Sequence, residues 1–148
     1  MAEQMTGGCA CGRIRYEAMI DNDDAYFCHC RMCQRATGSV SIAFKNIRKA
    51  DLEWAHEPDW FHSSPIARRP YCRECGTSLG FAHPDSDRID VTVASFDEPA
   101  RFRPTAHFGV ESMHRAWLCP PEGLKETRAD EYRPLVDRWM KAVGKLPE

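Results

Sequence analysis

Three cysteines, Cys28, Cys30 and Cys33, stand within six positions of the stretch CHCRMCQRATG. Three thiolates can bind a zinc ion, and a zinc site with three protein ligands keeps its fourth position for water or substrate. A fourth protein ligand would close the site and make it structural. Without a metal, Cys30 and Cys33 would instead form a redox-active C-x-x-C pair. The spacing thus raises the question of what occupies the fourth position.

The side chains that could close this site are few. Cys119 follows an apolar stretch and precedes two prolines, so we expect a small apolar residue there and no metal ligand. His29 lies between two of the cysteines and is expected to point away from the metal. The remaining candidates for a nitrogen ligand are His62, His107 and His114. None of them has a sequence context that favours it, so an open site and a site closed by one of these residues both stay possible at this point.

Four further cysteines form two tight pairs, Cys9–Cys11 in GGCACG and Cys72–Cys75 in YCRECGT. A C-x-C pair needs a turn before both sulfurs can bind one ion, and the glycines around it permit one: Gly7, Gly8 and Gly12. A C-x-x-C pair followed by glycine is typical of a zinc-binding turn. The two pairs therefore predict one structural zinc with four cysteine ligands, whose binding would contribute to folding.

The composition favours metal binding over disulfides. The N-terminal residues MAEQMTGG contain neither a basic segment nor an apolar core of a signal peptide, and no run of 18 apolar residues predicts a membrane span. We therefore expect a cytoplasmic protein, in which eight cysteines stay reduced, with disulfides as the alternative. The formal net charge of −2 argues against binding nucleic acid through a basic surface.

Alternating apolar residues predict half-buried strands in three segments, residues 13–20, 39–45 and 88–96. The inward-facing sets are Ile14, Tyr16, Ala18 and Ile20; Val40, Ile42 and Phe44; and Ile89, Val91 and Val93. Weaker strand patterns occupy residues 52–64, 77–83 and 104–110.

The last segment has a helical period instead. Apolar residues recur at helical spacing over about 134–143, with Pro134 suited to the first turn and Gly144 to the end. We expect this helix to pack its apolar stripe against a sheet. The whole chain, residues 1–148, is predicted to be one mainly β domain with a C-terminal helix.

The motifs GGCACGRIRY, FCHCRMCQRATGS, YCRECGTSL, SFDEP and HFGVESMHRAW occur in this order. Together they resemble the glutathione-dependent formaldehyde-activating enzyme family, also called the centromere protein V/GFA domain, over about residues 6–118. The resemblance implies a β-tent fold with two zinc ions per chain. It assigns Cys9, Cys11, Cys72 and Cys75 to a structural zinc, and Cys28, Cys30 and Cys33 to a second zinc with an open fourth position.

The resemblance also implies an activity, that of a carbon–sulfur lyase similar to S-(hydroxymethyl)glutathione synthase, which joins formaldehyde to glutathione. In this hypothesis the second zinc acts on a thiol or an aldehyde, and Arg31 and Arg35 pair with the carboxylates of a glutathione-like substrate. The alternative hypothesis is a non-catalytic zinc module that binds protein or nucleic acid. The sequence makes no prediction of the oligomeric state.

Overall fold

The computed structural model describes residues 2–147, which divide into two compact units with the boundary in the sequence after His114. The first unit contains the strands and, among its described residues, one α-helix. Its elements are β1 (Glu3–Gly8), β2 (Arg15–Ile20), β3 (Asp24–Cys28), α1 (Arg31–Thr37), β4 (Ile42–Arg48), β5 (Leu52–Trp54), β6 (Asp59–Ser64), β7 (Ala67–Tyr71), β8 (Gly80–Ala82), β9 (Arg88–Thr92) and β10 (Arg103–Phe108).

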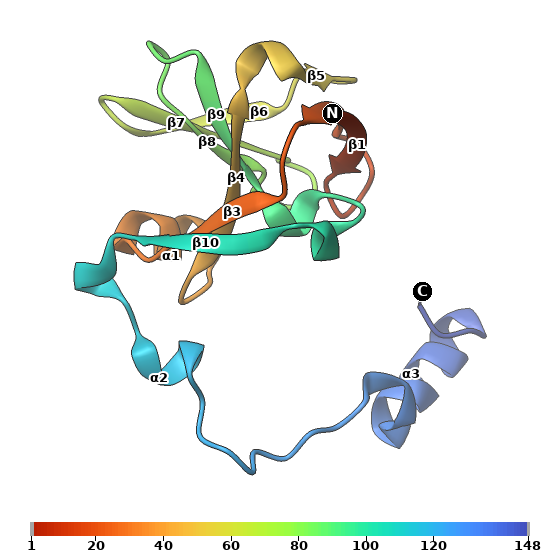
Figure 1. Cartoon of the computed structure of the whole chain (residues 1–148). Coiled ribbons are helices and arrows are strands. Elements are labelled where there is room, and N and C mark those ends of the chain that lie inside the picture. The colour runs from red at the N-terminus through yellow and green to blue at the C-terminus, as the bar shows by residue number, and fades with distance from the viewer. Residues whose placement is uncertain (1, 148) are drawn as a thin grey trace. The chain divides into compact units, whose positions relative to one another are not determined.

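Two sheets build the first unit (Figure 1). The smaller sheet has the order β1-β2-β5, and the larger, seven-stranded sheet has the order β10-β3-β4-β9-β8-β7-β6. All neighbouring strands are antiparallel except β10 and β3, which run parallel at the edge of the larger sheet. This parallel pair brings the end of β10 next to the end of β3, where the cysteine trio begins.

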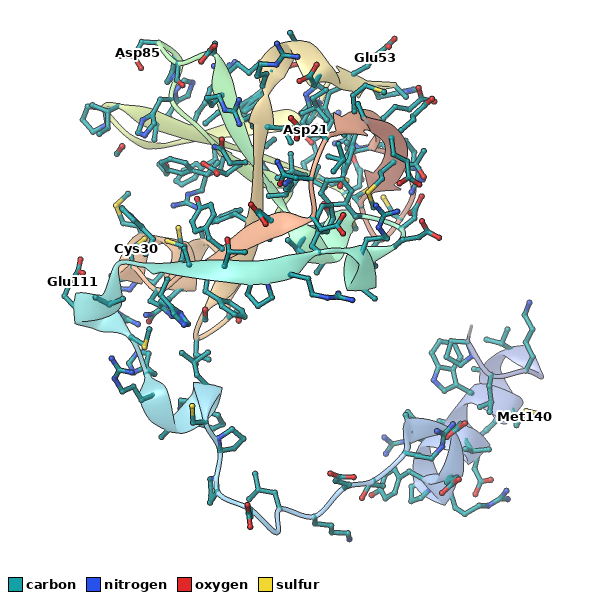
Figure 2. All side chains as sticks on the ribbon, in the orientation of Figure 1. Asp21, Cys30, Glu53, Asp85, Glu111 and Met140 are labelled. Carbon is teal, nitrogen blue, oxygen red and sulfur yellow. The ribbon has the colours of Figure 1, made fainter. Side chains whose placement is uncertain are left out.

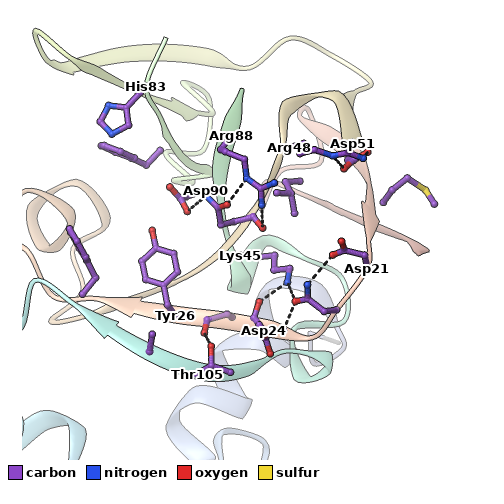
Figure 3. Close-up of a pocket in the computed structure, with 18 of the residues that line it drawn as sticks. Asp21, Asp24, Tyr26, Lys45, Arg48, Asp51, His83, Arg88, Asp90 and Thr105 are labelled. Atoms are coloured by element: carbon purple, nitrogen blue, oxygen red, sulfur yellow. Dashed lines mark hydrogen bonds and ion pairs between the residues drawn. The ribbon is translucent and has the colours of Figure 1, made fainter. Parts of the chain in front are cut away.

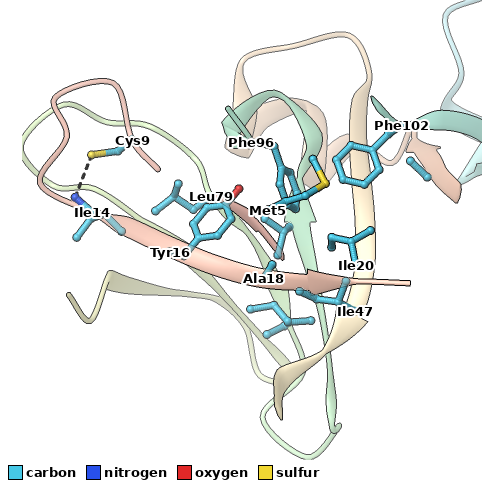
Figure 4. Packing of buried hydrophobic residues seen from close by; sticks show 14 of the residues in the cluster. Met5, Cys9, Ile14, Tyr16, Ala18, Ile20, Ile47, Leu79, Phe96 and Phe102 are labelled. Atoms are coloured by element: carbon cyan, nitrogen blue, oxygen red, sulfur yellow. Dashed lines mark hydrogen bonds between the residues drawn. The ribbon is translucent and has the colours of Figure 1, made fainter. Parts of the chain in front are cut away.

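The main core lies between the two sheets (Figure 4). The alternation predicted for residues 13–20 is confirmed, because Ile14, Tyr16, Ala18 and Ile20 are each at most 2% exposed. The Tyr16 ring contacts two other aromatic rings edge-on, and its hydroxyl forms a 2.8 Å hydrogen bond with Ser95 Oγ. Apolar residues of β4, β8 and β9 meet this face from the larger sheet.

Two of the predicted strands end or begin differently from the expectation. Val40 is 40% exposed and lies before β4, because the helix α1 and its left-handed cap Gly38 occupy the preceding residues. Val93 begins a 3-10 helix, Val93–Ser95, in which Ser95 Oγ donates to the Thr92 carbonyl at 2.8 Å. The predictions that Val40 and Val93 belong to strands are therefore wrong, while Ile42, Phe44, Ile89 and Val91 do lie on β4 and β9.

The second unit contains α2 (Arg115–Leu118) and α3 (Arg133–Val143). The predicted C-terminal helix is confirmed as α3, which has Pro134 in its first turn and ends at Gly144 with a φ of 78°. The mainly β class with a C-terminal helix is confirmed as well. The packing of the α3 stripe and the single-domain organisation stay predictions. No helix in residues 2–147 is long and apolar enough to cross a membrane.

Candidate metal centres

The first cysteine cluster joins two turns that are far apart in sequence. Cys9 and Cys11 lie in the turn between β1 and β2, and Cys72 and Cys75 lie in the turn after β7. Gly12 and Gly76 complete the turns with φ values of 79° and 77°, a region that only glycine adopts readily. The two turns are held together by the Ala10 amide, which donates to Thr77 Oγ1 at 3.1 Å.

The other two glycines of the first motif serve a different purpose. Gly7 and Gly8 belong to β1, so the expectation that they form the turn is wrong. A Cβ atom on Gly7 would overlap the Tyr16 hydroxyl, which shows that glycine is needed there for close packing of β1 on β2.

The sulfur geometry of this cluster fits a tetrahedral metal site. All four sulfurs lie within 4.8 Å of one another. Cys11 Sγ is 3.6 Å from Cys9 Sγ and 3.7 Å from Cys72 Sγ. A zinc ion with Zn–S bonds of about 2.3 Å separates its sulfur ligands by about 3.8 Å. A disulfide needs about 2.05 Å, and all eight cysteines are free, so the disulfide alternative does not describe this protein.

The second cluster is built where β3 leads into α1. Cys28 ends β3, Cys30 caps the N-terminus of α1, and Cys33 lies in the first turn of that helix. Cys28 Sγ is 3.5 Å from Cys30 Sγ and 3.4 Å from Cys33 Sγ. The Cys33 amide also donates to Cys30 Sγ at 3.4 Å. The strand-to-helix connection thus gathers three sulfurs at metal-ligand spacing, as the sequence predicted.

A buried side chain and a glycine hold this connection in place. Gln34 is 5% exposed, and its Nε2 donates to the His29 carbonyl at 2.6 Å and to the Ser112 carbonyl at 3.0 Å. Gly109, which follows β10, approaches Cys30 so closely that a Cβ atom there would lie 2.9 Å from the Cys30 amide nitrogen. Figure 2 shows Cys30 beside the end of β10, near Glu111. The segment after β10 therefore positions the trio.

Each cluster receives one hydrogen bond from an arginine. Arg69 on β7 is 3% exposed, and its Nη2 donates to Cys33 Sγ at 3.4 Å. The pKa of Cys33 is held well below its usual range, first because the Cys28 thiol donates to it and also because Arg69 donates to it. At the other cluster, Arg13 Nε donates to Cys72 Sγ at 3.4 Å, while the same guanidinium forms an ion pair with Asp59.

The trio gains no fourth ligand within the described part of the first unit. No other cysteine, histidine, aspartate or glutamate of these residues joins the group. His29 Nε2 instead forms a 2.8 Å hydrogen bond with His107 Nδ1, and His114 Nε2 bonds to Gln34 Oε1 at 3.2 Å. His62 is exposed on β6. Cys119 lies in the second unit, and its role stays a prediction.

The three cysteines of the trio line a small cavity of about 160 Å³. Its remaining walls are mainly apolar, and Tyr26, Phe81 and Phe108 on these walls also line a larger cleft of about 810 Å³. The two spaces therefore adjoin. A ligand with one end at the sulfurs could extend past the aromatic side chains into the cleft.

The larger cleft is lined by both polar and apolar side chains (Figure 3). Lys45 is 2% exposed and donates to Asn22 Oδ1 at 2.7 Å and to the Asp24 carbonyl at 2.6 Å. Asp90 accepts a 3.0 Å hydrogen bond from Asn46, but burial raises the pKa of its carboxyl above the usual range. Both cationic and anionic side chains thus line the cleft.

The sequence indicated two arginines, and the structure adds a third that contacts the trio. Arg31 and Arg35 lie exposed on α1, and the Arg31 guanidinium donates to Gln34 Oε1. Their contact with a substrate stays a prediction. Arg69 was missed, although a charged residue inside the strand before the YCRECG motif was a usable signal. Nothing in the sequence marked Gln34 as the residue that holds the trio against the segment after β10.

Comparison with known proteins agrees with the geometry. A protein from Schizosaccharomyces pombe named as an uncharacterized lyase is 32% identical over 77 residues, which is 52% of this chain and 56% of that relative. The match thus spans little more than half of the relative. The crystal structure of a Rhodobacter sphaeroides protein superposes with a TM-score of 0.57 at 23% identity, covering 70% of this chain and 99% of that one, and supports the fold.

The family model described as "Glutathione-dependent formaldehyde-activating enzyme" matches residues 4–112, a range that includes all seven clustered cysteines. Since this match covers well over half of the chain, the protein belongs to the glutathione-dependent formaldehyde-activating enzyme family.

Proposed function

We propose that this protein is a zinc-dependent enzyme of the carbon–sulfur lyase type that acts on a thiol/aldehyde adduct, similar to S-(hydroxymethyl)glutathione synthase. Family membership and the name of the yeast relative support a lyase. One observation carries the proposal. The three cysteines line a small cavity next to a larger cleft of mixed polarity, and no fourth ligand from the described residues of that unit fills the remaining position.

Zinc is the metal that we propose for both clusters, because thiolate ligands at tetrahedral spacing suit it. The cluster of Cys9, Cys11, Cys72 and Cys75 would hold a structural ion. Cys28, Cys30 and Cys33 would hold the second, which when bound favours the thiolate form of a substrate thiol or polarises a carbonyl.

In the reaction that we propose, a thiol adds to formaldehyde or a similar aldehyde. The sulfur lone pair forms the new C–S bond, the π electrons of the carbonyl move to oxygen, and the proton lost by the thiol ends on that oxygen. The reverse reaction breaks the same bonds. The walls of the small cavity are mainly apolar, and polar interactions are stronger in such surroundings.

Glutathione is the thiol that we propose as substrate. Its carboxylates could be held by Arg31 and Arg35, which are exposed on α1 next to the trio. Eight free cysteines suit a reduced compartment, and we propose the cytoplasm.

Cobalt substitution tests this function, because the absorption of cobalt reports its ligands. We expect glutathione to change the spectrum of wild-type protein, and Cys30→Ser to abolish the change while most of the fold is kept. Cys119→Ala serves as the matched control and should respond as wild type does. If thiols leave the wild-type spectrum unchanged, the second site is closed, and a non-catalytic zinc module becomes the better description.

A further inference from the structure

Arg69 is a buried cation whose hydrogen-bonding capacity is largely unused. Its side chain is 3% exposed, lies 4.9 Å from the centre of the Phe81 ring, and donates from Nη2 to Cys33 Sγ. Within residues 2–147, its Nε and Nη1 atoms are enclosed and have no hydrogen-bond partner. Buried donors without partners cost stability, so an oxygen acceptor beside this guanidinium would be favoured.

The arginine at the other cluster differs in this respect. Arg13 also donates to a cysteine sulfur, but Asp59 neutralises its charge. None of the ion pairs among the described residues involves Arg69. Its positive charge therefore acts on the trio and on a ligand bound beside the trio. With three thiolates, one zinc ion and Arg69, the formal charges of the second site sum to zero.

Space for such an acceptor lies beside the trio. Arg69 and all three cysteines line the same cavity of about 160 Å³. At about 30 Å³ for each water molecule, this space holds several water molecules or a small polar group of a ligand. An occupant that carries oxygen would have both the cysteines and the Arg69 side chain among its neighbours.

We propose that Arg69 is a catalytic residue that binds the oxygen atom of the substrate's carbonyl or hydroxymethyl group while the sulfur of the substrate is held at the trio. This inference rests on the proposed function. As the C–S bond forms, negative charge develops on the oxygen, and a donor already in place stabilises this charge. Arg69 keeps its own protons, because the proton that reaches the oxygen is the one lost by the thiol.

Two thiols of equal size test this role without an activity assay. Propane-1-thiol and 2-mercaptoethanol differ only in a terminal methyl or hydroxyl group, and both can be titrated into cobalt-substituted protein. For each protein we take the ratio of the Kd of propane-1-thiol to that of 2-mercaptoethanol. Arg69→Met should lower this ratio about tenfold relative to wild type, because a hydrogen bond from a charged donor is lost.

The control is Arg68→Met, which removes the same charge from the neighbouring residue of β7. Arg68 lies with its guanidinium 3.9 Å from the centre of the Trp60 ring and lines neither the small cavity nor the larger cleft. This variant should keep the wild-type ratio. Arg69→Lys, which retains the charge but loses the planar group of donors, should also lower the ratio, and it replaces Arg69→Met if that variant does not fold.

The outcomes separate the two proposals. If propane-1-thiol binds but the ratio stays unchanged in both Arg69 variants, Arg69 does not contact the oxygen and this inference is wrong, whereas the proposed function stands. If Arg68→Met lowers the Kd ratio as much as Arg69→Met does, the inference is also overturned. The loss of one positive charge anywhere on this strand would then explain the decrease. If neither thiol perturbs the wild-type spectrum, the proposed function fails and the role of Arg69 fails with it.

Discussion

Replacing Cys72 by serine should show whether the first cluster holds the fold together through a metal. Cys72 is completely buried, its sulfur accepts a hydrogen bond from Arg13, and it lies 3.7 Å from Cys11 Sγ across 61 residues of sequence. A serine hydroxyl is a poor zinc ligand. The substitution therefore weakens the link between the β1–β2 turn and the turn after β7.

The size of the effect follows from the ligand set. Structural zinc sites contribute about 10–16 kcal/mol, so one of four thiolates corresponds to roughly 3 kcal/mol. For a chain of this length, each 1 kcal/mol lowers Tm by about 2–4 °C. We therefore expect the Tm of metal-loaded Cys72→Ser to fall by about 6–12 °C, as measured by circular dichroism.

The same comparison in the presence of a strong chelator separates metal binding from packing. Without metal, wild type and Cys72→Ser should melt within a few degrees of each other, because the site no longer contributes to either. A loss of Tm that is equally large with and without metal would refute the reasoning and show that the serine acts through packing. If metal-loaded Cys72→Ser has the same Tm as metal-loaded wild type, the site has no structural role.

Four other outcomes are expected. Cys119→Ala should keep its full zinc content, and loss of one equivalent would identify Cys119 as the missing ligand. Under mild chelation, monitored with a colorimetric zinc indicator, the three-cysteine site should release its ion first, as a fast phase of zinc release. Cys30→Ser should remove this fast phase. Equal release rates would mean that both sites are closed. Gly7→Ala should cost about 1–3 kcal/mol in chemical denaturation, because its Cβ would overlap the Tyr16 hydroxyl; an unchanged midpoint would disprove this packing. Burial raises the folded-state pKa of Asp90 above its unfolded value, so stability is lost as pH rises through that pKa. Asp90→Asn should therefore raise Tm at pH 7 and lose this advantage below about pH 4. A gain in Tm that does not depend on pH would contradict the raised pKa.

The cysteine clusters could be predicted from sequence because their ligands occur in short local motifs. Spacing alone paired Cys9–Cys11 with Cys72–Cys75 and left Cys28, Cys30 and Cys33 as a second group, and the structure brings together these two groups. The strand alternation around Tyr16 and the end of α3 at Gly144 were also readable, since side-chain period and backbone preference are properties of neighbouring residues.

Contacts between distant strands were decided only by the tertiary structure. Arg69 reaches Cys33 across 36 residues, and Gln34 reaches the Ser112 carbonyl across 78. Both contacts depend on which strands are neighbours and in what register, and a one-residue shift of a strand turns its side chains to the opposite face. The local pattern of residues specifies which face of a strand is apolar. It does not specify which other strand will lie against it, so the cavity beside the trio and the arginine that lines it follow from the fold and not from any single motif.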